Sequence, residues 1–164
     1  MPFFILEKTA TTYNWYASKV FKSRSTIIRG LEERSVHYYQ TKLAPGLLFI
    51  YCTEDFVREL NEDHWGKIYF YRDPSQTRVQ PVSTGEMNAF ILVTSVTDDL
   101  ILIDKPTPEF LQGQRVRVTD GLFRGAEGVI KRLKGDRRLI VSINGVAAVA
   151  TCYIRPEFLE KVEA

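Results

Sequence analysis

Cysteine, histidine, methionine and tryptophan are scarce in this sequence, with two of each among 164 residues. Cys52 and Cys152 lie far apart, and neither His37 nor His64 has a Cys or His at a metal-binding spacing. Because zinc sites draw on closely spaced Cys and His ligands, we predict no metal site. Two distant thiols are typical of a reducing compartment, and a single disulfide between them stays an alternative.

Long apolar runs are also absent. No run approaches the ~20 residues that a membrane-spanning helix needs. Residues 1–8, MPFFILEK, contain four consecutive apolar residues with no basic residue before them, which predicts that no signal peptide is present. We therefore expect a soluble, cytoplasmic protein without a membrane partner.

Patterns typical of enzymes are missing as well. Gly121, Gly125 and Gly128 lie in the stretch GQRVRVTDGLFRGAEGVIKR, which matches neither the phosphate-binding loop nor the dinucleotide fingerprint. Gly128 is followed by β-branched residues rather than by a helix, so these glycines predict turns and close strand contacts. No candidate nucleophile, general base or pair of carboxylates has a sequence spacing typical of a catalytic site. We expect a binding protein with no catalytic residues and no cofactor.

The composition is that of a folded protein, with 45% hydrophobic and 26% charged residues. The net charge of +2 is distributed unevenly. Residues 113–164 hold ten Lys and Arg against six Asp and Glu, whereas residues 1–112 hold twelve against fourteen. This contrast predicts two units with different surfaces.

The first part of the chain alternates short strands and helices. Apolar periodicity predicts strands over 14–21, 35–41, 44–53 and 67–73, and helices over 23–34, 54–63 and 83–95. Ser83 and Glu86 have the spacing of a capping box at the start of the last helix, and residues 100–103 predict a short edge strand. This order predicts an α/β sandwich over residues 1–103, with helices on one face of a small sheet.

The second part of the chain is rich in β-branched residues and turns. Pro106 and Pro108 predict a linker over 104–112. From 113 to 164, four or five short strands are separated by tight turns, among them Asn144-Gly145, a strong hairpin signal. The expected fold class is therefore α+β, in which the sandwich is followed by a small β-barrel.

Two motifs in this sequence resemble those of a known family. One is the KOW-like pattern Val116-x-Val118-x-x-Gly121-x-Phe123-x-Gly125-x-x-Gly128-Val129. The other resembles the N-terminal domain of NusG-type transcription factors, with Trp15-Tyr16 on the first strand and Pro45-Gly46-x-x-Phe49-Ile50 on a central strand. The resemblance covers about residues 14–162 and implies a NusG N-terminal-like domain followed by an SH3-like KOW barrel.

Factors of this family bind the clamp helices of RNA polymerase through the open face of the N-terminal sheet and promote processive elongation. In the segment GLLFIYC, alternation separates Leu48, Ile50 and Cys52 from Leu47, Phe49 and Tyr51. Helices on one face leave the second set exposed as a partner surface. We predict that this set and Pro45 contact the polymerase; the alternative is that the barrel or the segment FFIL covers it.

The resemblance also implies nucleic-acid contacts, with non-template DNA or nascent RNA as candidate partners. The matching positions in the first unit are Lys22, Arg24, His64 and Trp65. Cations suit phosphates, and an exposed Trp65 would stack on an unpaired base. The alternative is a solvated helix start with Trp65 in the core. In the barrel, basic residues that include Arg124, Lys131 and Arg132 are candidates for RNA contacts.

One loop departs from the family pattern. Housekeeping NusG proteins contact Rho or a small-subunit ribosomal protein through a loop with Phe-Gly-Arg, where this sequence has Asn144-Gly145-Val146. The departure argues against Rho and ribosome contacts and favours a specialised paralogue, similar to RfaH and the UpxY-type antitermination factors. The alternative function is that of a KOW-type RNA-binding protein of the ribosome, although such proteins are usually far more basic than this chain.

Overall fold

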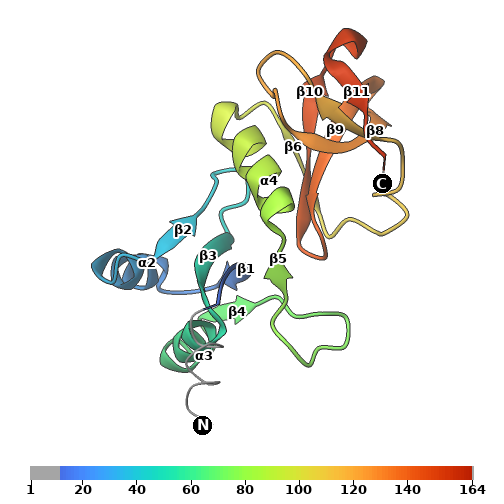
Figure 1. The fold of residues 1–164 in the computed structure, drawn as a ribbon. Helices are drawn as coiled ribbons and strands as arrows, with labels where there is room; N and C mark the ends of the chain where they lie inside the picture. The colour runs from blue at the N-terminus through green and yellow to red at the C-terminus, as the bar shows by residue number, and fades with distance from the viewer. Residues whose placement is uncertain (1–11, 164) are drawn as a thin grey trace. The chain divides into compact units, whose positions relative to one another are not determined.

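The computed structural model describes residues 12–163 (Figure 1), so the prediction about a signal peptide in residues 1–8 lies outside the described residues. Contacts between residues divide the chain into two units, Met1–Thr84 and Gly85–Ala164. Within the described part, no helix is both long and apolar enough to cross a bilayer.

The first unit is built on an antiparallel sheet with the strand order β2-β3-β1-β4, in which β5 also pairs with β1. Its strands are β1 (Tyr13–Val20), β2 (His37–Tyr39), β3 (Leu47–Thr53), β4 (Ile68–Phe70) and β5 (Pro81–Val82). Its helices are α2 (Arg24–Glu33) and α3 (Glu54–Asp63). Apart from the short β5, these elements match the ranges that periodicity predicts to within a few residues.

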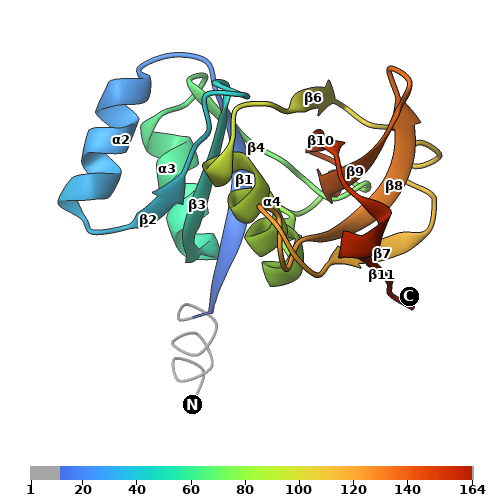
Figure 2. The same ribbon diagram turned by 90° about the horizontal axis from the view of Figure 1, so that it is seen from above.

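Helices α2 and α3 cover one face of this sheet (Figure 2). The alternating residues Leu48, Ile50 and Cys52 of β3 are buried in one hydrophobic cluster with Leu31 of α2 and Val57 of α3. The predicted division of β3 into a helix-covered set and a second set is therefore confirmed.

The two helices begin in different ways. At α3, the Thr53 side chain accepts a hydrogen bond from the Phe56 amide at 3.1 Å. Glu54 and Asp55 follow in the first turn, where negative charges interact favourably with the positive end of the helix dipole. At α2, Ser23 has the left-handed φ of 59° and makes no side-chain cap bond.

The second unit contains α4 (Thr84–Val96) and an antiparallel sheet with the strand order β11-β7-β8-β9-β10-β6. The strands are β6 (Ile101–Asp104), β7 (Arg115–Val118), β8 (Glu127–Leu133), β9 (Asp136–Ile143), β10 (Ala147–Tyr153) and β11 (Leu159–Lys161), with a short 3-10 helix, η1 (Pro156–Phe158), before β11. Among the described strands, no pairing joins β11 to the other end of the sheet, so the expected closed barrel is not seen. Strand β6 occupies the free edge of β10, where such a barrel would close.

The boundary between the units differs from the expected one at residue 103. Strand β6 pairs with β10, with Ile101 opposite Ala150 and Asp104 opposite Ala147. The segment expected to be a linker, 104–112, contains Phe110 and Leu111, which pack against a buried cluster of the second sheet. Non-local pairing and these two apolar side chains therefore place residues 101–112 with the second unit, whose boundary by residue contacts is at Gly85. At the start of α4, the capping bond between Ser83 and Glu86 stays a prediction, and the Glu86 carboxylate accepts a hydrogen bond from the Asn144 amide at 3.4 Å.

Glycines fix the connections of this sheet as expected at two positions. Gly121 has a φ of 85° in the turn after β7. At Gly128, a Cβ would lie 2.1 Å from the carbonyl oxygen of Ile140 on β9, so only glycine fits. Gly125 differs from expectation, because open space surrounds it and its φ of 93° is what requires glycine.

Candidate functional site

The sheet face of the first unit that points away from α2 and α3 carries the candidate site. In the strand register, Tyr51 lies opposite Trp15 of β1 and His37 of β2, and Phe49 lies opposite Ala17 and Tyr39. Directly opposite residues of antiparallel strands share one face. We call the resulting surface the aromatic face; its members are Tyr13, Trp15, His37, Tyr39, Phe49 and Tyr51.

The aromatic face is open at the end where β3 runs into α3. The ring of Tyr51 stacks on Tyr13 with centroids 5.7 Å apart and meets Trp15 at 5.4 Å. Tyr13, His37 and Tyr51 are exposed, and Trp15 is half-buried. Exposed aromatic side chains held against one another are typical of surfaces that bind protein or nucleic-acid partners.

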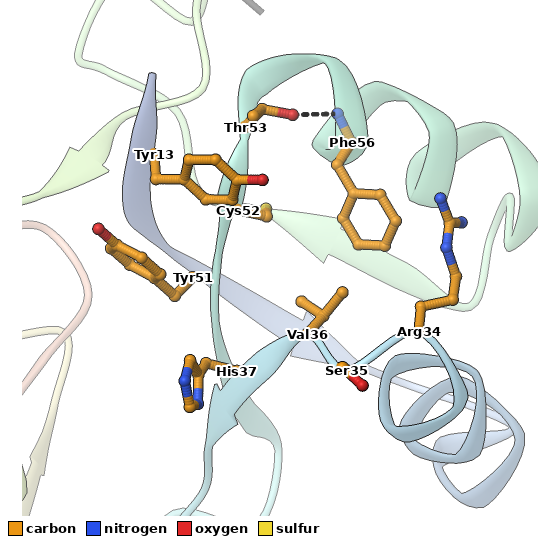
Figure 3. Close-up of a pocket in the computed structure, with 9 residues that line it drawn as sticks. All are labelled: Tyr13, Arg34, Ser35, Val36, His37, Tyr51, Cys52, Thr53 and Phe56. Carbon is orange, nitrogen blue, oxygen red and sulfur yellow. Dashed lines mark hydrogen bonds between the residues drawn. The ribbon is translucent and has the colours of Figure 1, made fainter. Parts of the chain in front are cut away.

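A pocket of about 480 Å³ adjoins this end of the aromatic face (Figure 3). Its lining residues come from the ends of β1, β2 and β3 and the starts of neighbouring segments: Tyr13, Arg34, Ser35, Val36, His37, Tyr51, Cys52, Thr53 and Phe56. The Arg34 guanidinium lies 4.5 Å from the centre of the Phe56 ring and forms an ion pair with Glu59. Burial raises the pKa of the Cys52 thiol to about 12, so this sulfur stays protonated and is a poor nucleophile. The lining of the pocket is mixed, with aromatic rings next to a guanidinium group, an imidazole and hydroxyl groups.

The exposure predicted for Leu47, Phe49 and Tyr51 is wrong at two of the three positions. Phe49 is 0% exposed and Leu47 is 7% exposed, whereas Tyr51 is 38% exposed and Pro45 is exposed. Strand β3 lies between β1 and β2, so Phe49 has neighbours on both flanks. The alternation of residues along β3 correctly identified which residues share the face, but along this strand the exposed part of the face begins only at Tyr51. Whether these four residues contact a polymerase stays a prediction.

Of the four residues predicted to bind nucleic acid in the first unit, the fold brings Lys22 close to the turn that contains the other two, His64 and Trp65. The amides of Phe21 and Lys22 donate to the Lys67 carbonyl at 2.7 and 3.4 Å, so the end of β1 lies beside the turn that holds His64 and Trp65. Trp65 is 78% exposed, which excludes the alternative that it is a core residue. Arg24 is half-buried on α2, and its side chain bonds Gln40.

The second unit separates the three predicted barrel residues. Arg124 is exposed in the turn before β8, whereas Lys131 and Arg132 are near the opposite end of that strand. Lys131 lies 5.6 Å from the centre of the Phe110 ring. These residues do not form one site, and their nucleic-acid contacts stay predictions.

Several residues of these surfaces were missed from sequence alone. Tyr13 and His37 join the aromatic face, and exposed Phe21 and Lys67 extend the surface around Trp65. The alternation of residues 13–19 could have identified Tyr13, because it shares the parity of Trp15 and Ala17. The pairing of β2 with β3 that places His37 could not be read locally. Within residues 12–163, no group of three His, Cys, Asp or Glu could hold a metal ion.

Comparison with known proteins shows a NusG-like fold. A solved structure of NusG from Thermotoga maritima, from work on domain interaction in that protein, is similar to 94% of this chain and 99% of its own. The TM-score is 0.50 and the sequence identity is 19%. No family model and no curated protein matches the sequence.

Proposed function

We propose that this protein is a transcription elongation and antitermination factor of the NusG type, which binds the clamp helices of RNA polymerase through the aromatic face. The observation that carries the proposal is the group of contacting aromatic residues Tyr13, Trp15 and Tyr51, of which Tyr13 and Tyr51 are exposed, on the sheet face opposite α2 and α3 of a NusG-like fold. The likeness to NusG over nearly the whole length of both chains supports it.

The geometry supports contact with an apolar helical surface. Tyr51 and Tyr13 present a stacked pair next to a pocket that is open to solvent. Aromatic side chains at the centre of an interface contribute most of the binding energy, since they bury large areas with few rotatable bonds. Tyr51 is therefore the proposed anchor, with Pro45 at the margin. Leu47 and Phe49 lie on the same face of β3 and are buried in this structure.

Within the NusG type, we propose a specialised factor similar to RfaH and the UpxY-type proteins rather than a housekeeping one. The turn between β9 and β10, Asn144-Gly145, contains neither phenylalanine nor arginine. The surface around Trp65, Phe21 and Lys22 supports recruitment by an unpaired base, because it combines exposed rings with cations. The second unit is proposed to be a KOW domain. The role is binding and not catalysis.

The test compares two exposed tyrosines in the full-length chain. Tyr51→Asp places a charge on the aromatic face, and Tyr153→Asp makes the same change at an exposed site on β10. Retention on RNA polymerase, and on a fragment containing its clamp helices, is measured for both variants. We expect at least about a tenfold loss of affinity for Tyr51→Asp and unchanged binding for Tyr153→Asp. Phe49→Asp is less suitable, because a buried charge would unfold the unit.

The outcomes separate the site from the function. Equal retention of Tyr51→Asp and wild type contradicts the site. If the wild-type chain does not bind RNA polymerase but cosediments with ribosomes, the result contradicts the proposed transcription function and favours the alternative of a KOW-type ribosomal protein. Circular dichroism of each variant checks that the fold is intact.

A further inference from the structure

The charge excess of the second unit is concentrated on one hairpin. Residues 131–138, KRLKGDRR, hold five Lys and Arg against one Asp. The other residues of 113–164 hold five cations and five carboxylates. The hairpin between β8 and β9 therefore carries the whole positive excess of this part of the chain.

Strand register places like charges directly opposite each other. Lys131 pairs with Arg138, and Arg132 pairs with Arg137. Successive residues point to opposite faces of a strand, so each face of the hairpin carries one cationic pair. Directly opposed like charges destabilise a sheet. This arrangement weakens the isolated hairpin, and an anionic partner would reverse that effect.

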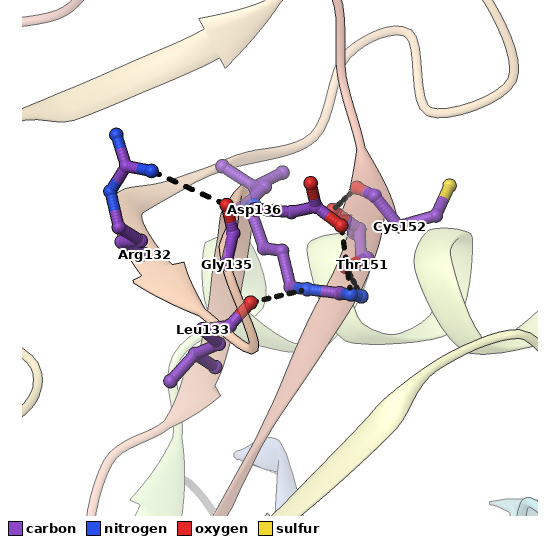
Figure 4. Close-up of polar contacts among 8 residues, drawn as sticks. Arg132, Leu133, Gly135, Asp136, Thr151 and Cys152 are labelled. Carbon is purple, nitrogen blue, oxygen red and sulfur yellow. Dashed lines mark hydrogen bonds and ion pairs between the residues drawn. The ribbon is translucent and has the colours of Figure 1, made fainter.

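Of these five cations, Arg138 is structural, Lys131 lies half-buried over the Phe110 ring, and three are available. The Arg138 side chain is 15% exposed and donates to the Leu133 carbonyl at 3.1 Å and the Thr151 carbonyl at 3.0 Å. In contrast, Arg132, Lys134 and Arg137 are exposed. The Arg132 side chain donates to the Gly135 carbonyl at 3.3 Å (Figure 4), and the side chains of Lys134 and Arg137 have no hydrogen bond or ion pair within residues 12–163. We call these three residues the hairpin cations.

The hairpin extends beyond the strands that flank it. Strand β7 pairs with β8 only over residues 127–129, and β10 pairs with β9 no further than Arg138. Lys134 and Gly135 form the turn with φ values of 51° and 84°. Both values are left-handed, as in a type I′ turn, where Asn, Asp or Gly is usual. A lysine at this strained position places a cation at the tip of a two-stranded ribbon.

We propose that this hairpin binds a base-paired nucleic-acid stem by entering a groove, with the hairpin cations contacting phosphates on both walls. A two-stranded β-ribbon fits the major groove of B-form DNA. A groove places phosphates along both strands of the ribbon at once, which matches Arg132 on β8 and Arg137 on β9 with Lys134 at the tip, whereas an acidic peptide strand would lie along one strand only. The contacts are to the backbone and are independent of sequence. The inference does not depend on the proposed polymerase binding.

The test is equilibrium binding of the full chain to labelled stems of about 20 base pairs, roughly two helical turns. One stem is RNA and the other is DNA of the same sequence. The hairpin variant R132Q/K134Q/R137Q is compared with R115Q/R155Q/K161Q, which removes three exposed cations elsewhere in residues 113–164. Arg138 is left in place because it holds β9 to β10.

We expect the hairpin variant to lose at least about tenfold in affinity on one or both stems. The slope of log K against log salt should fall by about three, one for each lost phosphate contact. The control variant should lose less than about threefold, with a slope change below about one. A loss on the RNA stem alone identifies RNA as the source of the phosphates, and a loss on the DNA stem alone identifies DNA.

Three outcomes would overturn the proposal. The two variants could lose affinity equally, the wild type could bind neither stem, or a single strand of the same length could bind as tightly as the stems. Competition by polyglutamate as effective as that of the stems, at equal charge concentration, would point instead to an acidic protein. Circular dichroism of both variants shows that the charge changes leave the fold intact.

Discussion

Gly128 lies so close to Ile140 that a Cβ on the glycine would meet the Ile140 carbonyl oxygen at 2.1 Å. We expect Gly128→Ala to lower the free energy of unfolding by about 3 kcal/mol, because the backbone of β9 cannot move without breaking its pairing. The same substitution at Gly30, inside α2 with no atom within 4 Å, should instead stabilise by about 0.5–1 kcal/mol. Urea unfolding followed by circular dichroism measures both. A Gly128→Ala change below about 1 kcal/mol would contradict the close contact.

The two helix starts predict opposite effects of small substitutions. Thr53→Ala removes the bond from the Phe56 amide and should cost about 1 kcal/mol. Ser23 makes no cap bond and has a φ of 59°, so Ser23→Gly should stabilise by about 0.5–1 kcal/mol. Thermal unfolding of the two variants and the wild type tests this contrast, and a loss of stability in Ser23→Gly would contradict it.

The two thiols should differ in reactivity. Cys52 is buried with a pKa raised to about 12, whereas Cys152 is half-buried, and both are free. At pH 8 we expect a thiol reagent to modify Cys152 first and Cys52 only after unfolding. Cys152→Ser should remove the fast phase. Rapid modification of that variant under native conditions would show that Cys52 is accessible.

The same burial predicts a dependence of stability on alkaline pH. The pKa of Cys52 is raised in the folded state above its value of about 8.5 in an unfolded chain. Its contribution is therefore complete below that lower value and is lost as the pH rises toward 12. Between pH 9 and 10.5 the wild type should lose more stability than Cys52→Ala. Equal losses in the two proteins would contradict a protonated buried thiol.

Local pattern was sufficient for much of the first unit. The alternation of Leu48, Ile50 and Cys52 identified the face that packs on the helices, and this prediction is confirmed. The burial of Phe49 was not predictable in the same way, because a period of two assigns a side chain to a face without showing what surrounds it there. Trp65 was ambiguous in sequence, since large aromatics occur both in cores and on binding surfaces.

The second unit shows where sequence reasoning ends. Asn144-Gly145 and Gly128 carry their conformational requirement in the residue type, so the turn and the close contact were predictable. The position of β6 was not, because its partner Ala147–Ala150 lies more than forty residues further along the chain. Pro106 and Pro108 suggested a free segment, whereas Phe110 and Leu111 attach it to the core of this sheet.

The pairing of β6 with β10 has a consequence for dividing the chain into fragments. A piece that begins at residue 113 would lack Ile101–Asp104, leaving the outer edge of Ala147–Ala150 with amides and carbonyls that bond only to water. An exposed edge without charged residues, such as that of β10 (Ala147–Tyr153), recruits strands from other copies. Proteolysis between 104 and 112 would therefore release a self-associating product, and a well-behaved C-terminal fragment has to start upstream of Ile101.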